Sequence, residues 1–249
     1  MQKSRYFLKL AYNGTSFHGW QVQNNAVTVQ GEIQKALSIL LREEIAIMGC
    51  GRTDTGVHAS CFYAHFESES LPFSEDKLVY KLNALLGKDI AIYSAFKVNE
   101  ELHTRFSALE REYKYYISTR KNPFNANAWL YVGKPDVKLM NDAAKHLLTV
   151  SDFGAFCKAH AGNATNICKV VHAEWTVENE HLVFTIRADR FLRNMVRSVV
   201  GTLLMVGEQK INFTDFKNII QSGQRSLAGE SVPAKGLFLT DVIYPFDND

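Results

Sequence analysis

The sequence predicts an α+β fold of two ferredoxin-like units, because each half of the chain shows the order strand, helix, strand, strand, helix, strand. The first unit is expected over residues 1–102 and the second over residues 103–249. A chain of 249 residues suits two domains of ordinary size or one large domain. Two such units can fuse edge to edge into one broad, mainly antiparallel sheet with helices on one face.

The elements of the first half follow from hydrophobic periodicity and capping residues. Alternating large apolar side chains from Tyr6 to Tyr12 predict the first strand. Thr28 can cap a helix that runs to about residue 43, and Ser74 opens a second helix that Gly87 ends. The remaining strands are expected near residues 45–50, 57–66 and 90–98.

The same signals predict the elements of the second half. Its strands are expected near residues 108–118, 168–178, 181–188 and 237–244, and the middle two turn at Glu178-Asn179-Glu180. Its helices are expected near residues 136–149, 191–206 and 213–221.

The composition is that of a soluble globular protein, with 46% hydrophobic and 22% charged residues. No apolar run approaches the roughly 18 residues of a membrane span, and the N-terminus leads into a strand without the core of a signal peptide. The four cysteines lack the spacing of a zinc site. We therefore expect a cytoplasmic protein with reduced thiols and neither membrane association nor a metal. The net charge of +2 excludes a histone-like partner but not local basic surfaces.

The most informative segment is residues 51–59, which read Gly-Arg-Thr-Asp-Thr-Gly-Val-His-Ala. Glycines at positions 49, 51 and 56 allow tight or left-handed backbone conformations, so the loop can present Asp54. The guanidinium of Arg52, two residues upstream, favours the ionised carboxylate. A lone Asp-X-Gly would be an ordinary surface turn, whereas nine specified positions in a row favour a functional carboxylate.

Two functions compete for this loop. The Asp54-Thr55-Gly56 triplet is that of aspartic proteases, which need two carboxylates that share one proton. The chain has one such triplet, so a dimer would have to supply the second. The positive charge of Arg52 would also oppose the raised carboxyl pKa that a shared proton requires. The other interpretation is a solitary nucleophilic carboxylate.

The segment resembles the signature of the tRNA pseudouridine synthase A family, in which a Gly-Arg-Thr-Asp-Ala-Gly-Val-His run carries the catalytic aspartate. Asp54 holds that position here, and Thr55 stands where alanine is usual. The resemblance extends from about residue 6 to residue 245 and is weakest over residues 154–170. The pseudouridine synthase fold that it implies has the broad antiparallel sheet that the element order predicts.

A second motif of the family resembles residues 106–115 and places Tyr113 on its active-site tyrosine. An aromatic ring there can stack on the uracil face, although a tyrosine-rich strand is more often core packing on residue types alone. The preceding His103-Thr104-Arg105-Phe106 also fits the family pattern, which makes Arg105 a candidate contact to RNA or to the active site.

A third motif resembles residues 191–201, and its arginine, which pairs with the catalytic aspartate, maps to Arg197. On a helix from residue 191, Arg190, Arg193 and Arg197 would lie within about 60° of one another. Such a stripe could contact RNA or remain a solvated basic face. Residues 235–239 resemble the closing motif, whose apolar side chain lines the uracil pocket, so Leu237 is either that residue or ordinary strand core.

The resemblance implies an enzyme that isomerises uridine in the anticodon stem-loop of tRNA, at tRNA positions 38, 39 and 40. Asp54 would attack C1′ of the sugar or C6 of the base, or abstract a sugar proton, after the base has flipped out. Arg52 would fill the vacated place or hold the phosphate of the flipped nucleotide. An isomerisation needs no cofactor, and the sequence shows no P-loop, Rossmann glycine fingerprint or zinc cluster.

The alternative class is a non-catalytic RNA-binding module, because paired ferredoxin-like units also form RNA platforms. The aromatic signature of RRM domains is missing, and a binding module has no use for an aspartate framed by glycines. The resemblance further implies a homodimer in which one subunit holds the tRNA body while the other modifies the anticodon stem.

Overall fold

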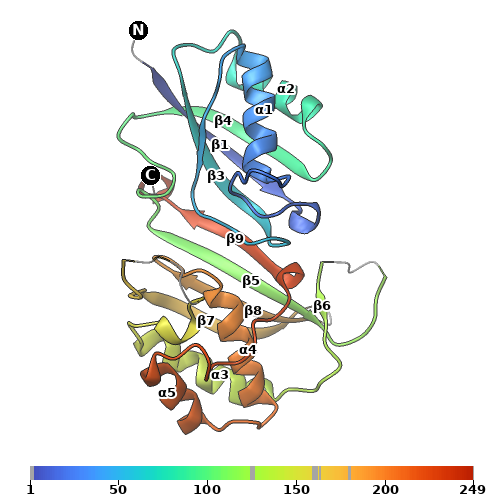
Figure 1. Cartoon of the computed structure of the whole chain (residues 1–249), viewed down its shortest axis with the longest axis vertical. Coiled ribbons are helices and arrows are strands. Elements are labelled where there is room, and N and C mark those ends of the chain that lie inside the picture. The colour runs from blue at the N-terminus through green and yellow to red at the C-terminus, as the bar shows by residue number, and fades with distance from the viewer. Residues whose placement is uncertain (1–2, 124–126, 159–161, 163, 179–180, 249) are drawn as a thin grey trace. The chain divides into compact units, whose positions relative to one another are not determined.

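The computed structural model describes residues 3–123, 127–158, 162, 164–178 and 181–248 of the chain (Figure 1). Its contacts divide the chain into two compact units. The first comprises Met1–Leu109 and Phe238–Asp249, and the second comprises Glu110–Leu237. The boundary that the sequence suggested between residues 102 and 103 therefore lies further along the chain, and the last strand returns to the first unit.

The first unit has the predicted order of elements. Its helices and strands are β1 (Ser4–Tyr12), α1 (Val29–Leu41), β2 (Ile47–Gly49), β3 (His58–Ser68), α2 (Glu75–Leu85) and β4 (Ile90–Val98). Both helices begin at the expected caps, since the side chain of Thr28 accepts from the N–H of Gly31 and that of Ser74 from the N–H of Lys77.

Antiparallel pairing arranges the first unit's strands in the order β4-β1-β3, and β2 also pairs with β3. The last strand, β9 (Leu237–Ile243), runs parallel to the start of β3, with Phe238 opposite His58. The backbone N–H of Leu109 in turn donates to the carbonyl of Ile243 at 2.8 Å. These long-range bonds explain why the C-terminal residues belong to the first unit.

Both faces of this sheet are covered. Figure 1 shows α1 and α2 next to each other on one face. On the other face, the ring of Phe7 packs against Tyr244 at 5.8 Å and against Phe246 at 6.2 Å. Because neighbouring residues of a strand point to opposite faces, Leu8 and Leu10 contribute to the helix-covered core, where both are fully buried.

The second unit contains a three-stranded antiparallel core sheet with helices. Its elements are β5 (Glu110–Ser118), β6 (Trp129–Leu130), α3 (Val137–His146), β7 (Val170–Glu178), β8 (His181–Ala188), α4 (Met195–Gly207) and α5 (Phe213–Ser222). β8 lies between β5 and β7, and the short β6 adds a parallel pairing to β5. Residues 179–180 of the predicted turn at 178–180 lie outside the described residues. The predicted α+β class with mainly antiparallel strands is confirmed.

One helix begins later than the sequence suggested. α4 starts at Met195 instead of residue 191, and Asn194 before it is left-handed with φ of 67°. The side chain of Asp189 accepts from the N–H groups of Lys169 and Arg190, at 2.8 and 2.7 Å. Because Arg190 and Arg193 precede this helix, the predicted stripe of Arg190, Arg193 and Arg197 on one helix face is wrong.

Within the part of the chain that the structure describes, no helix is long and apolar enough to cross a lipid bilayer.

Candidate active site

Asp54 lies in the loop between β2 and β3, where its side chain is half-buried. Arg52 and Thr55 on either side are exposed. The loop thus presents the carboxylate at the surface of the first unit without burying it in the core, as the sequence predicted.

A second loop, residues 13–20, fixes the backbone on both sides of Asp54. The N–H of Trp20 donates to the carbonyl of Thr53 at 3.3 Å, and the N–H of Gly56 donates to the carbonyl of Phe17 at 3.3 Å. The hydroxyl groups of Tyr12 and Thr53 lie 2.8 Å apart in a further hydrogen bond. Asp54 therefore lies between Thr53 and Gly56, which are both hydrogen-bonded to the 13–20 loop, and this limits the positions that its carboxylate can take.

Glycine is required at two positions where these loops meet. Gly19 has φ of +86°, and a β-carbon there would lie 2.4 Å from the carbonyl oxygen of Thr53. Gly56 has φ of +79°, a left-handed conformation that side chains disfavour. The sequence indicated the role of Gly56 but not that of Gly19, whose only local signal is its place in a His-Gly-Trp turn.

His58, just after the loop, is a structural residue. It is 1% exposed, its ring stacks on Phe238 at 4.4 Å, and its Nδ1 accepts from the N–H of Gly14 at 3.0 Å. A ring nitrogen that accepts a backbone N–H carries no proton, so the neutral ring has its proton on Nε2. His58 thereby anchors the start of the 13–20 loop from within the sheet.

Arg105, also in the first unit, lies exposed on the segment that follows β4. Its guanidinium carbon is 5.5 Å from the centre of the Phe106 ring, within the range of a cation–π contact. Arg52, Asp54 and Arg105 thus all belong to the first unit, with Arg52 and Asp54 sharing one loop.

The remaining predicted residues belong to the second unit. Tyr113 lies on β5 opposite Ile186, half-buried, and its ring meets Phe191 edge-to-face at 5.1 Å. Tyr115 on the same face is fully buried, and its hydroxyl donates to the carbonyl of Pro233 at 2.8 Å. Burial raises the pKa of Tyr115. The core-packing interpretation of the tyrosine strand therefore holds for Tyr115.

Arg197 lies in the first turn of α4 and is half-buried. Its Nε donates to the carbonyl of Val232 at 2.6 Å, and the N–H of Val232 donates to the carbonyl of Arg197 at 3.3 Å. Gly201, one turn further along, would bring a β-carbon to 1.9 Å from the carbonyl oxygen of Glu230. The segment around residues 228–233 therefore packs directly on α4.

Arg193 is exposed in the loop before α4, and its carbonyl accepts from the N–H of Lys158 at 3.0 Å. Asn194 next to it donates from its side chain to Ser231 Oγ at 2.5 Å. Leu237 is the first residue of β9 and is 6% exposed. Ser231 had no recognisable signal in the sequence, because its role depends on the fold that brings residues 228–233 to α4.

The described residues contain no group of three or more His, Cys, Asp or Glu side chains that could hold a metal ion. As a carboxylate, Asp54 can act as a nucleophile or accept a proton.

Comparison with known proteins identifies the class and then the family. Residues 143–245 match a family described as tRNA pseudouridine synthase. The carboxylate of Asp54, on the loop that residues 13–20 hold in place, suits that class. A tRNA pseudouridine synthase A of Bacteroides fragilis is 50% identical over 247 residues, which is 98% of each chain. Another, of Parabacteroides distasonis, is 50% identical and covers 97% of this chain and 96% of its own. The chain belongs to the tRNA pseudouridine synthase A family.

Proposed function

We propose that this protein isomerises uridine to pseudouridine in tRNA, with Asp54 as the catalytic carboxylate. The observation that carries the proposal is that backbone hydrogen bonds fix the Asp54 loop at Thr53 and at Gly56, while the side chain of Asp54 between them stays partly exposed. Such a fixed carboxylate can be held close to one atom of a substrate, which is a main source of catalytic rate. The relatives that match nearly the whole chain are named for this activity.

The reaction balances without a co-reactant. The N1–C1′ bond of uridine breaks, the base turns, and a C5–C1′ bond forms. A proton leaves C5 and N1 gains one, so no electrons are exchanged with a cofactor. Asp54 attacks C1′ of the sugar or C6 of the base, or abstracts a sugar proton.

The other candidate residues take the roles that the family resemblance implies. The exposed Arg52 fills the place of the flipped base or holds its phosphate, and Tyr113 stacks on the uracil. Arg197 pairs with the catalytic carboxylate, and Leu237 lines the uracil pocket. Arg105 and Arg193, both exposed, contact the RNA.

The proposed substrate site is the anticodon stem-loop, at tRNA positions 38, 39 and 40, and the proposed assembly is a homodimer in the cytoplasm. A net charge of +2 on each chain is modest for holding a whole tRNA. Two subunits that share the tRNA would double the basic surface available to it.

Tritium release tests this function. The chain is incubated with tRNA that carries tritium at C5 of its uridines, and the label released to water is counted. An isomerase releases tritium from the target positions, and tRNAs in which one uridine each is replaced by cytidine identify them. Binding of tRNA without any release would instead make the protein an RNA-binding module.

A further inference from the structure

A tight turn at residues 103–107 is closed by the side chains of its own ends. The N–H of His103 donates to Ser107 Oγ at 2.9 Å, and the N–H of Ser107 donates to the carbonyl of His103 at 2.9 Å. Nδ1 of His103 accepts from the N–H groups of Arg105 and Phe106, at 3.0 and 3.3 Å. Four hydrogen bonds thus fix a segment of five residues.

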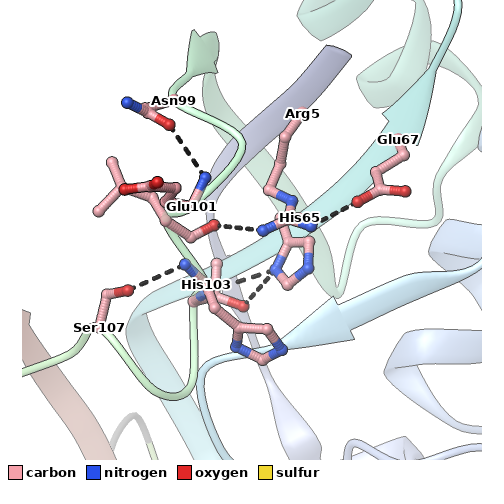
Figure 2. Close-up of polar contacts among 9 residues, drawn as sticks. Arg5, His65, Glu67, Asn99, Glu101, His103 and Ser107 are labelled. Atoms are coloured by element: carbon pink, nitrogen blue, oxygen red, sulfur yellow. Dashed lines mark hydrogen bonds and ion pairs between the residues drawn. The ribbon is translucent and has the colours of Figure 1, made fainter. Parts of the chain in front are cut away.

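The turn is also fastened to the sheet of the first unit (Figure 2). Nδ1 of His65 on β3 lies 2.7 Å from Thr104 Oγ1. The hydroxyl of Tyr244 donates to the carbonyl of Thr104 at 2.6 Å. Just before the turn, Arg5 on β1 donates to the carbonyl of Leu102 at 2.8 Å. Thr104 itself is fully buried. The turn is therefore a rigid part of the first unit.

At its tip, this rigid turn exposes an aromatic ring next to a cation. Phe106 is 76% exposed, and the guanidinium of Arg105 lies 5.5 Å from its ring. A phenylalanine held out of the core forgoes the hydrophobic gain of burial. Because the turn already restricts the conformations of Phe106, the ring loses less conformational entropy when it binds a partner.

We propose that Phe106 and Arg105 form a contact for one unpaired nucleotide of the substrate tRNA, with the Phe106 ring stacked on the base and the Arg105 guanidinium on its phosphate. An aromatic face accepts any base, and the neighbouring positive charge selects a phosphate-bearing partner over an apolar one. The proposal rests on the proposed function for the identity of the RNA. His103, Ser107 and Thr104 are positioning residues for this contact.

The test measures tRNA affinity in the full chain carrying Asp54→Asn, so that the RNA is not converted during titration. In that background Phe106→Ala should weaken binding by about 5- to 100-fold, the range for loss of one stacked base, and leave its salt dependence unchanged. Phe106→Trp should restore the affinity. Arg105→Gln should instead lower the slope of log affinity against log salt by a little under one.

Tyr80→Ala is the matched control, because Tyr80 is an aromatic residue of the same unit that is 74% exposed. It should leave the affinity unchanged. The proposal is overturned if Phe106→Ala binds tRNA within about twofold of its parent, or if Tyr80→Ala loses as much. It is also overturned if Phe106→Ala abolishes self-association at unchanged RNA affinity, since the ring would then contact a second copy.

The two proposals fail separately. Tritium release by the wild-type chain together with normal binding by Phe106→Ala would remove this contact alone. Weakened binding by Phe106→Ala with no tritium release by the wild type would remove the isomerase function and leave the contact in place.

Discussion

A β-carbon on Gly19 would lie 2.4 Å from the carbonyl oxygen of Thr53, the residue before Asp54. Two segments that are far apart in the sequence therefore meet beside the proposed catalytic carboxylate, and they meet so closely that the residue at position 19 must be glycine. The geometry of the proposed nucleophile depends on a loop that carries no chemistry of its own.

We expect Gly19→Ala to lower the rate of isomerisation by roughly 100-fold, because a shift of about 1 Å in a reacting group has an effect of that order. The left-handed backbone and the close contact should also lower the free energy of unfolding, by about 1–3 kcal/mol. Gly51→Ala is the control within the Asp54 loop itself, since a β-carbon there meets nothing within 4 Å. Single-turnover rates and unfolding midpoints of both variants check this. Equal rates for the two variants would mean that the 13–20 loop does not position Asp54.

Asp54→Asn should abolish turnover, to below roughly a thousandth of the wild-type rate, because an amide can neither attack as a nucleophile nor accept the proton. The fold and the affinity for tRNA should stay nearly intact, since a half-buried loop position contributes little to stability. Asp142→Asn, an exposed position on α3, removes the same charge and should retain full activity. Tritium release and tRNA titration measure both effects. A substantial residual rate in the Asp54 variant would rule out this carboxylate as the nucleophile.

Much of the fold was predictable because its signals are local. Thr28 and Ser74 begin their helices through bonds to residues three positions away, and the alternating large apolar side chains of β1 mark its helix-covered face. The Asp54 loop was also recognisable in the sequence, because the glycines that flank Asp54 form a local pattern.

What escaped prediction depends on contacts between distant segments. α4 begins only at Met195, and Asp189 before it accepts from the N–H of Lys169, 20 residues back along the chain. The return of β9 to the first unit depends on its pairing with β3. The hydrogen bond from Trp20 to Thr53 also joins two loops, and the sequence of neither loop predicts that they meet.

Arg197→Ala should lower the rate by orders of magnitude and move the acid limb of the pH–rate profile to higher pH. Without the positive charge that the family resemblance pairs with the catalytic aspartate, the protonated carboxyl is favoured. The substitution also removes a bond to the carbonyl of Val232, so a loss of rate alone would not identify the role. An acid limb at unchanged pH would leave Arg197 as a residue that holds the segment around Val232.

Sedimentation at micromolar concentration should give about twice the mass of the 28.2 kDa chain, because we propose a homodimer with twofold symmetry. A mixed dimer of wild-type and Asp54→Asn chains should retain activity at its one intact site. A monomer that turns over full-length tRNA at the normal rate would contradict the proposed assembly.

The stability of the protein should fall as the pH is lowered from about 6.5 to 4. Burial, together with the neighbouring His103 and Arg5, lowers the pKa of His65 from 6.5 to about 4. In that pH window the unfolded chain binds a proton at this position and the folded chain does not, so acid favours unfolding, whereas the contribution is fully present above pH 6.5. The difference amounts to at most about 3 kcal/mol. Burial also lowers the pKa of His103, which adds to the same slope.

His65→Gln should flatten this dependence, because the amide does not titrate but can still bond to Thr104. The matched control is His172→Gln on β7, where the imidazole is exposed beside Glu174. Urea denaturation at a series of pH values between 4 and 8 measures the free energy of unfolding for all three chains. If the wild type and His65→Gln lose stability in parallel, the buried imidazole is not the group that titrates, and the acid sensitivity must arise elsewhere in the chain.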